Sequence, residues 1–129
     1  MVIDTSAIVA IMLREATASR LLAAILAAEA REMSVVSHVE VATVLTPRGV
    51  LPQQIDTLLG ALGVALVAVD DVQGREAIRA RITYGKGTGH PAKLNFGDTF
   101  TYALAKTRGA PLLFVGDDFS HTDLVDALA

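Results

Sequence analysis

The sequence contains no cysteine and no tryptophan, and aromatic residues make up only 5% of its 129 residues. Without Cys the protein has no disulfide, no thiol nucleophile and no thiolate metal ligand. The scarcity of aromatic side chains predicts a core built from Ala, Val, Leu and Ile. The first residues hold no basic segment followed by a long apolar run, so we expect no signal peptide.

Long apolar runs and an excess of positive charge are missing as well. The most apolar stretch is interrupted by Arg14, Glu15, Arg20 and Glu29, so we expect no transmembrane helix. The formal net charge is −3, whereas proteins that bind nucleic acid through bulk charge are usually basic. Any role in binding nucleic acid would therefore depend on a local site.

The residues that are present predict one ordered α/β domain spanning 1–129. The hydrophobic fraction is 52% and the charged fraction 19%, and the length suits a single core. Short apolar segments that alternate with helical patterns predict a parallel sheet with helices on both faces. The first expected strand ends at Asp4, and the other three span 33–36, 64–69 and 112–115. The expected helices span 5–13, 16–30, 37–45, 52–62, 72–83, 99–109 and 120–128.

Acidic residues occur at related places in this pattern. Asp4 ends the first strand, Glu40 lies in the first turn after the second, and Asp117 and Asp118 follow the fourth. In a parallel sheet the strand ends and the starts of the following helices share one edge, where ligands bind. Asp98 is the exception, because its helix precedes a strand. It reaches that edge only if the connection is unusual.

Each acidic residue also has a purely structural interpretation. Asp4 and Asp98 suit helix N-caps, Glu40 has the capping-box spacing from Ser37, and the Asp117–Asp118 pair suits a turn. If the carboxylates instead converge, a hard divalent cation such as Mg²⁺ or Mn²⁺ would neutralise them and assist phosphodiester hydrolysis. A non-catalytic, Mg²⁺-binding α/β regulatory module is the alternative. The sequence pattern leaves these interpretations open.

Four segments, which together span nearly the whole chain, carry a resemblance to a known family. They are MVIDTSAIVAI, SHVEVATVL, LNFGDTFTYALAK and PLLFVGDDFSHTDL. The chain resembles the PIN-domain ribonucleases, specifically the VapC-type toxins of bacterial VapBC toxin–antitoxin pairs. The resemblance implies a three-layer α/β/α fold, with a short, mostly parallel sheet, in which the carboxylates converge. It also implies a Mg²⁺- or Mn²⁺-dependent endoribonuclease of the bacterial cytoplasm, which acts on tRNA or another structured RNA.

The same resemblance assigns roles to the acidic residues. Asp4 and Asp98 are expected to be the principal metal ligands. Glu40 would complete the coordination or hold a metal-bound water. Asp118 is preferred as the fourth acid because it directly precedes a Phe, and Asp117 is the alternative.

Partners and supporting residues follow from the resemblance too. A cognate VapB-like antitoxin would inhibit the enzyme, and the chain is expected to form a homodimer. The apolar helix surface between residues 7 and 62 offers a place for either contact. Thr5 or Ser6 is expected to hydrogen-bond the carboxylates, and Asn95 to brace the turn before Asp98.

A glycine-rich, basic segment at residues 84–93 is the only long loop that the pattern predicts. It lacks the spacing of a nucleotide-binding loop and follows a helix rather than a strand. We expect either a mobile loop in which Lys86, His90 and Lys93 contact RNA phosphates, or a solvated polar loop.

Overall fold

Four short strands form the centre of the computed structural model, which describes residues 1–129. They are β1 (Val2–Ile3), β2 (Glu32–Ser34), β3 (Ala65–Val67) and β4 (Leu112–Leu113). All neighbours pair in parallel, in the order β3-β2-β1-β4. The helices are α1 (Thr5–Met12), α2 (Ala18–Ala27), α3 (Val35–Leu45), α4 (Pro52–Ala61), α5 (Asp71–Tyr84) and α6 (Phe96–Arg108), with 3₁₀ turns η1 (Thr46–Arg48) and η2 (Asp118–His121). The predicted α/β class is confirmed.

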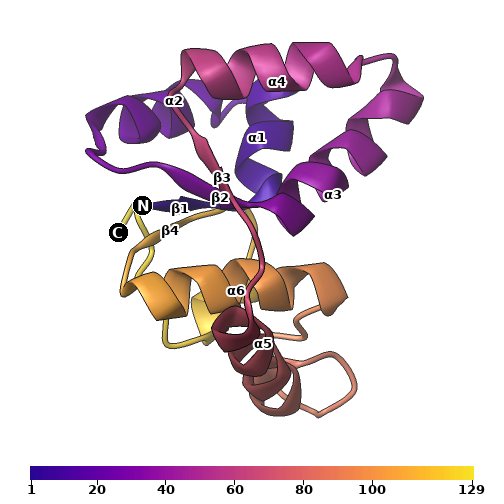
Figure 1. Ribbon diagram of the computed structural model, residues 1–129, viewed down its shortest axis with the longest axis vertical. Helices are drawn as coiled ribbons and strands as arrows, with labels where there is room; N and C mark the ends of the chain where they lie inside the picture. The colour runs from indigo at the N-terminus through magenta and orange to yellow at the C-terminus, as the bar shows by residue number, and fades with distance from the viewer.

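The helices cover both faces of the sheet, which gives the three layers expected. Helices α1 to α4 lie on one side and α5 and α6 on the other (Figure 1). The central strands supply both cores because successive strand residues point to opposite faces. Ile3 and Leu113 belong to the cluster under α1 to α4, whereas Val2 and Leu112 belong to the cluster against α6. None of the helices is both long and apolar enough to cross a membrane.

The start of α3 differs from the prediction. Ser34, not Ser37, is the N-cap, and its hydroxyl accepts a hydrogen bond from the Val36 amide at 3.2 Å. The second strand therefore ends two residues earlier than expected, and Glu40 lies in the second turn of the helix. The capping-box interpretation of Glu40 is wrong. Both serines suit a cap by type, and the pairing of β2 with its neighbours decides between them.

The predicted last helix, residues 120–128, is also wrong. After η2 the chain runs extended along β4, where the Leu112 amide donates to the Val125 carbonyl and the Ala127 amide donates to the Leu112 carbonyl. The tail thereby satisfies backbone groups of an edge strand that would otherwise be unpaired. A helix of nine residues at a chain end would be stabilised less by its own hydrogen bonds than the tail is by pairing with β4.

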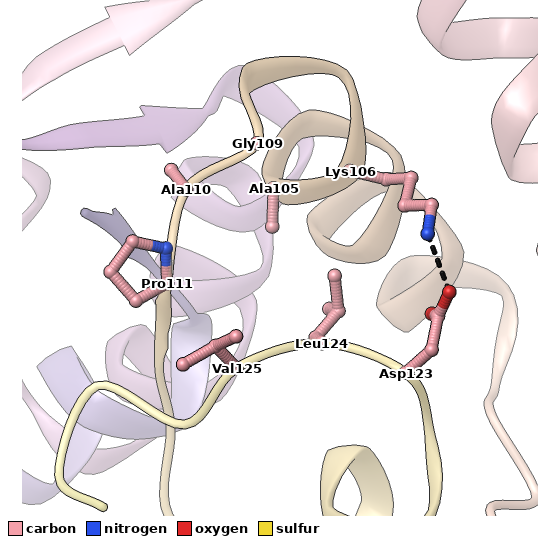
Figure 2. A pocket seen from close by; sticks show the side chains of 8 residues that line it. All are labelled: Ala105, Lys106, Gly109, Ala110, Pro111, Asp123, Leu124 and Val125. Atoms are coloured by element: carbon pink, nitrogen blue, oxygen red, sulfur yellow. Dashed lines mark hydrogen bonds and ion pairs between the residues drawn. The ribbon is translucent and has the colours of Figure 1, made fainter.

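Side chains fasten the same tail to α6. Tyr102 donates its hydroxyl proton to Asp123 Oδ1 at 2.7 Å, and Lys106 forms an ion pair with the other oxygen of Asp123 (Figure 2). A pocket of about 320 Å³ lies beside this contact, between the end of α6 and the tail. None of the four predicted acidic residues lines it, so we interpret it as part of the fold.

Candidate active site

The four acidic residues preferred from the sequence line one crevice of about 230 Å³. Asp4, Glu40, Asp98 and Asp118 come from four segments that are far apart in the chain. The other lining residues are Thr5, Ser6, Val9, Val44, Asn95, Val115 and Phe119. Asp117 does not line the crevice, which agrees with the preference for its neighbour.

Asp4 serves as a helix cap and also as a wall of the crevice. It is only 5% exposed, and its Oδ2 accepts hydrogen bonds from the Ser6 amide at 3.0 Å and the Ser6 hydroxyl at 2.7 Å. Its Oδ1 accepts from the Thr101 hydroxyl at 2.9 Å. The two interpretations of Asp4 are therefore compatible: the residue that caps α1 also presents a carboxylate at the sheet edge.

Glu40 reaches the crevice from the middle of α3 because α6 carries a glycine opposite it. A Cβ built on Gly97 would lie 2.3–2.4 Å from the Glu40 carboxylate atoms, so only glycine leaves that space free. The Thr5 hydroxyl lies 3.4 Å from Glu40 Oε1 and 3.2 Å from the Ser37 carbonyl, and donates toward both. The sequence prediction of a hydroxyl beside the carboxylates is confirmed.

Asp98 lies in the first turn of α6, three residues after the N-cap Asn95. The two residues form a reciprocal pair: the Asp98 amide donates to Asn95 Oδ1 at 2.9 Å, and the Asn95 amide donates to Asp98 Oδ2 at 3.0 Å. Asp98 therefore takes the acidic position of a capping box rather than the N-cap position predicted as its structural role. The expectation that Asn95 braces this turn is confirmed.

The connection before α6 explains how Asp98 reaches the carboxyl edge. Helix α5 is seen nearly end-on in Figure 1, whereas α6 lies across the view, so the two do not form a simple antiparallel pair. The segment between them closes with a bridge from Gly85 to Leu94. Because α5 runs across α6 instead of antiparallel to it, the connection from β3 to β4 is unusual, as was required for Asp98 to reach the carboxyl edge.

Asp118 is held by its neighbour rather than by bonds of its own. It is exposed in η2, whereas Phe119 is 3% exposed and packs against Phe114 with 5.5 Å between ring centroids. The buried Phe119 ring thus anchors the turn that presents Asp118 to the crevice.

The carboxylates influence one another electrostatically. Burial raises the pKa of Asp98 to about 7; the hydrogen bond with Asn95 opposes this shift, and the charges of Asp4, Asp118 and Glu40 reinforce it. Burial and the charge of Asp4 also raise the pKa of Glu40. The charges of Asp4, Glu40 and Asp118 therefore act on Asp98 within one crevice.

The donor set suits a hard cation by its chemistry. It consists of carboxylate oxygens, the ligands that Mg²⁺ and Mn²⁺ prefer, and contains no His or Cys. A bound cation would also offset the neighbouring charges that add to the effect of burial on the pKa of Asp98. No three acidic or histidine side chains are placed close enough to hold one ion entirely by themselves.

Three residues that shape the site were not predicted from the sequence, namely Ser37, Gly97 and Thr101. The sequence predicts Ser37 as a helix cap, but its hydroxyl is buried and lies 2.9 Å from that of Thr101. Thr101 follows Asp98 by three residues, a spacing that places both on one face of α6. That spacing was the available signal, whereas the role of Gly97 depends on the packing of α3 against α6.

The fold and the crevice define an α/β domain whose carboxylates gather at the carboxyl edge of a parallel sheet. The family model "PIN domain" matches residues 1–125. The chain is 45% identical to ribonuclease VapC42 of Mycobacterium tuberculosis over 126 residues, which cover 96% of each chain. It is 48% identical to ribonuclease VapC of Mycolicibacterium smegmatis over 126 residues, covering 96% of this chain and 97% of the relative. The chain belongs to the PIN-domain family.

Solved structures share the fold at lower sequence identity. The toxin VapC20 of M. tuberculosis, described as cleaving the sarcin–ricin loop, superposes with a TM-score of 0.74 at 19% identity and covers 97% of this chain and 96% of that one. A toxin–antitoxin complex from Klebsiella pneumoniae gives a TM-score of 0.72 at 17% identity, covering 98% and 96%. These similarities support the three-layer PIN fold.

Proposed function

We propose that this chain is the toxin of a type II toxin–antitoxin pair, an endoribonuclease that hydrolyses phosphodiester bonds in RNA with Mg²⁺ or Mn²⁺ in the bacterial cytoplasm. The observation that carries the proposal is the meeting of four carboxylates from distant segments in one crevice. The ribonuclease names of the relatives support the same reaction.

Asp4 and Asp98 are the residues that would hold the cation, with Glu40 and Asp118 beside them. When bound, a divalent cation lowers the pKa of a water and stabilises charge that develops on phosphate. Asp4 contributes a carboxylate already oriented by three donors, and the Asn95 amide fixes one oxygen of Asp98. Glu40 would accept a hydrogen bond from the attacking water and orient it.

RNA would approach over the segment that connects α5 to α6. Lys86 and Lys93 are exposed there, and Lys93 lies two residues before Asn95 of the crevice. Their ammonium groups would contact phosphates beside the scissile bond. His90 is partly engaged within the loop, because its Nδ1 accepts the Ala92 amide at 3.1 Å. We therefore assign the phosphate contacts to the two lysines first.

The antitoxin would close the crevice from the side of α3. Val9 and Val44 line the crevice, and Val39 on α3 is 60% exposed. An apolar partner segment can bury these side chains while a basic side chain enters among the carboxylates and excludes the cation. A complex with an open, metal-loaded crevice would refute this mode of inhibition.

A second copy of the chain is proposed to bind on the α5–α6 side. Ile78, Ile82 and Phe96 are 62%, 71% and 76% exposed around an apolar groove of about 260 Å³. A two-fold contact needs a patch that is complementary to itself, and protruding side chains beside a groove form such a patch. An Ile82→Lys variant should shift the dimer to monomer in light scattering. If the variant stays dimeric, the contact lies elsewhere, for example on the surface between residues 7 and 62.

The regulatory-module alternative gains no support from the site. Phosphotransfer to Asp4 would need room for a whole phosphoryl group on its carboxylate, yet the residue is only 5% exposed. Such modules also use a Lys near the end of a later strand, whereas Val115 and Gly116 follow β4 in this chain.

The test is cleavage of total RNA by the purified protein, read by sequencing the new RNA ends. The wild type should cut with Mg²⁺ or Mn²⁺ and stop cutting with EDTA. Asp4→Asn should abolish cutting while the protein stays folded, because Asn retains the helix cap. Asp56→Asn, a neutralised acid on α4 outside the crevice, should cut like the wild type. Cleavage that persists in EDTA or in Asp4→Asn would refute the proposal.

A further inference from the structure

Two buried hydroxyl groups lie directly behind Asp4, outside the crevice. The Thr101 hydroxyl in α6 donates to Asp4 Oδ1 at 2.9 Å. The hydroxyl oxygen of Thr101 lies 2.9 Å from that of Ser37 in α3. Thr101 and Ser37 are both 0% exposed. This hydrogen-bond chain therefore joins α3, α6 and the end of β1 at one carboxylate.

The chain has a direction that follows from the donor count. An ionised carboxylate can only accept, so the single hydroxyl proton of Thr101 points to Asp4. Ser37 must then be the donor in its contact with Thr101. Ser37 thus donates one hydrogen bond, whereas Thr101 accepts one and donates one, so rotation of Thr101 would break two hydrogen bonds at once.

The other oxygen of Asp4 is restrained from the opposite side. Ser6 donates to Oδ2 through its amide and its hydroxyl, and the Ser6 hydroxyl accepts from the Val115 amide at 2.9 Å. Donors on both oxygens determine the plane of the carboxylate. Oδ1 accepts only the Thr101 hydrogen bond, so it keeps a lone pair that these contacts do not use.

We infer that Thr101, oriented by Ser37, is a positioning residue that holds the Asp4 carboxylate in the orientation in which it binds a divalent cation. The inference rests on the proposed function and deepens it. Thr101 does not line the crevice, so it acts only through Asp4. Removing such an outer partner of a metal ligand typically weakens metal binding by roughly 10- to 100-fold.

A purely structural role for the two hydroxyls makes a different prediction. They would then only satisfy one another in a buried place, and their loss would lower stability without changing affinity for the cation. Measuring metal affinity on folded protein separates the two roles. Thr101→Val keeps the shape and removes the donor, whereas Thr101→Ser keeps the donor.

The experiment is titration of Mn²⁺ into the metal-free protein, followed by electron paramagnetic resonance, together with kcat and KM for RNA cleavage and the melting temperature. Thr101→Val should bind Mn²⁺ about 10- to 100-fold more weakly and lose kcat with KM for RNA nearly unchanged. Thr101→Ser should stay close to wild type in both. The matched control is Thr99→Val, which removes a buried hydroxyl of α6 that bonds the Phe96 carbonyl rather than Asp4.

Equal Mn²⁺ affinity in folded Thr101→Val and wild type would overturn the inference and leave the proposed function intact. A wild type that neither binds Mn²⁺ nor cuts RNA would overturn both. If Thr101→Val does not fold, Ser37→Ala takes its place, since it frees Thr101 to rotate while Asp4 keeps a donor in reach. Weaker Mn²⁺ binding in Ser37→Ala supports the inference, and unchanged binding refutes it.

Discussion

Replacing Gly97 by Ala should separate stability from activity in this protein. Gly97 is buried at the start of α6, facing the Glu40 carboxylate of α3. The added Cβ would meet Glu40 Oε2 at 2.3 Å, whereas ordinary contact begins at 3.4 Å. The Glu40 carboxylate must therefore move by about 1 Å or turn away from the crevice.

The cost in stability should be small. The obstructing atoms are the far end of a flexible side chain, so a change of rotamer relieves most of the overlap, which in a rigid core would cost ~1–3 kcal/mol. Replacing Gly by Ala within a helix stabilises the folded state by about 0.5–1 kcal/mol, which offsets part of this cost. We expect the free energy of unfolding to change by no more than about 1 kcal/mol.

The cost in activity should be large. A displacement of about 1 Å in a catalytic group can lower a rate on the order of 100-fold, so cleavage of RNA by Gly97→Ala should fall by about that factor. Urea unfolding gives the free energy, and initial rates of cleavage give the activity. Gly60→Ala is the matched control, because a Cβ at Gly60 meets nothing within 4 Å; it should gain stability and keep full activity.

Two results would refute this reasoning. Full activity in Gly97→Ala would mean that the position of Glu40 does not matter for cleavage. A loss of stability of several kcal/mol would mean that α3 and α6 cannot adjust, so that the lower activity would report misfolding instead. A double variant with Glu40→Gln tests the link further, since the two changes should not add if Gly97 acts only through Glu40.

Three further outcomes follow from the structure. The pKa of Asp98 is raised from the reference value of 3.8 to about 7 in the folded protein, so between these pH values the folded state binds more protons than the unfolded state. Metal-free protein should therefore lose thermal stability as the pH rises from 4 to 7. Bound Mg²⁺ or the Asp98→Asn substitution should remove this pH dependence. Asp118→Asn should impair cleavage and Asp117→Asn should not, in the same RNA assay. Tyr102→Phe should cost about 1 kcal/mol in urea unfolding with unchanged cleavage, since only the bond to Asp123 is lost.

The residues that determine local structure made much of this fold predictable from the sequence. Pro52 and Gly109 mark the limits of α4 and α6 as expected. Short apolar segments between helical patterns correctly indicated parallel strands, because crossover helices bury both faces of such a sheet. The last helix failed as a prediction, since the tail gains more by pairing with the edge of β4 than by coiling on itself.

Sequence alone determined which acidic residues were candidates and, through the resemblance, that they meet. It could not determine the start of α3, because Ser34 and Ser37 suit a cap equally well until β2 pairs. Only the tertiary structure decided that Glu40 projects from a second helical turn, that Gly97 makes room for it, and that Ser37 and Thr101 support Asp4. These contacts join residues up to 97 positions apart in the sequence. Whether such residues meet depends on how α3 and α6 pack, which no local pattern encodes.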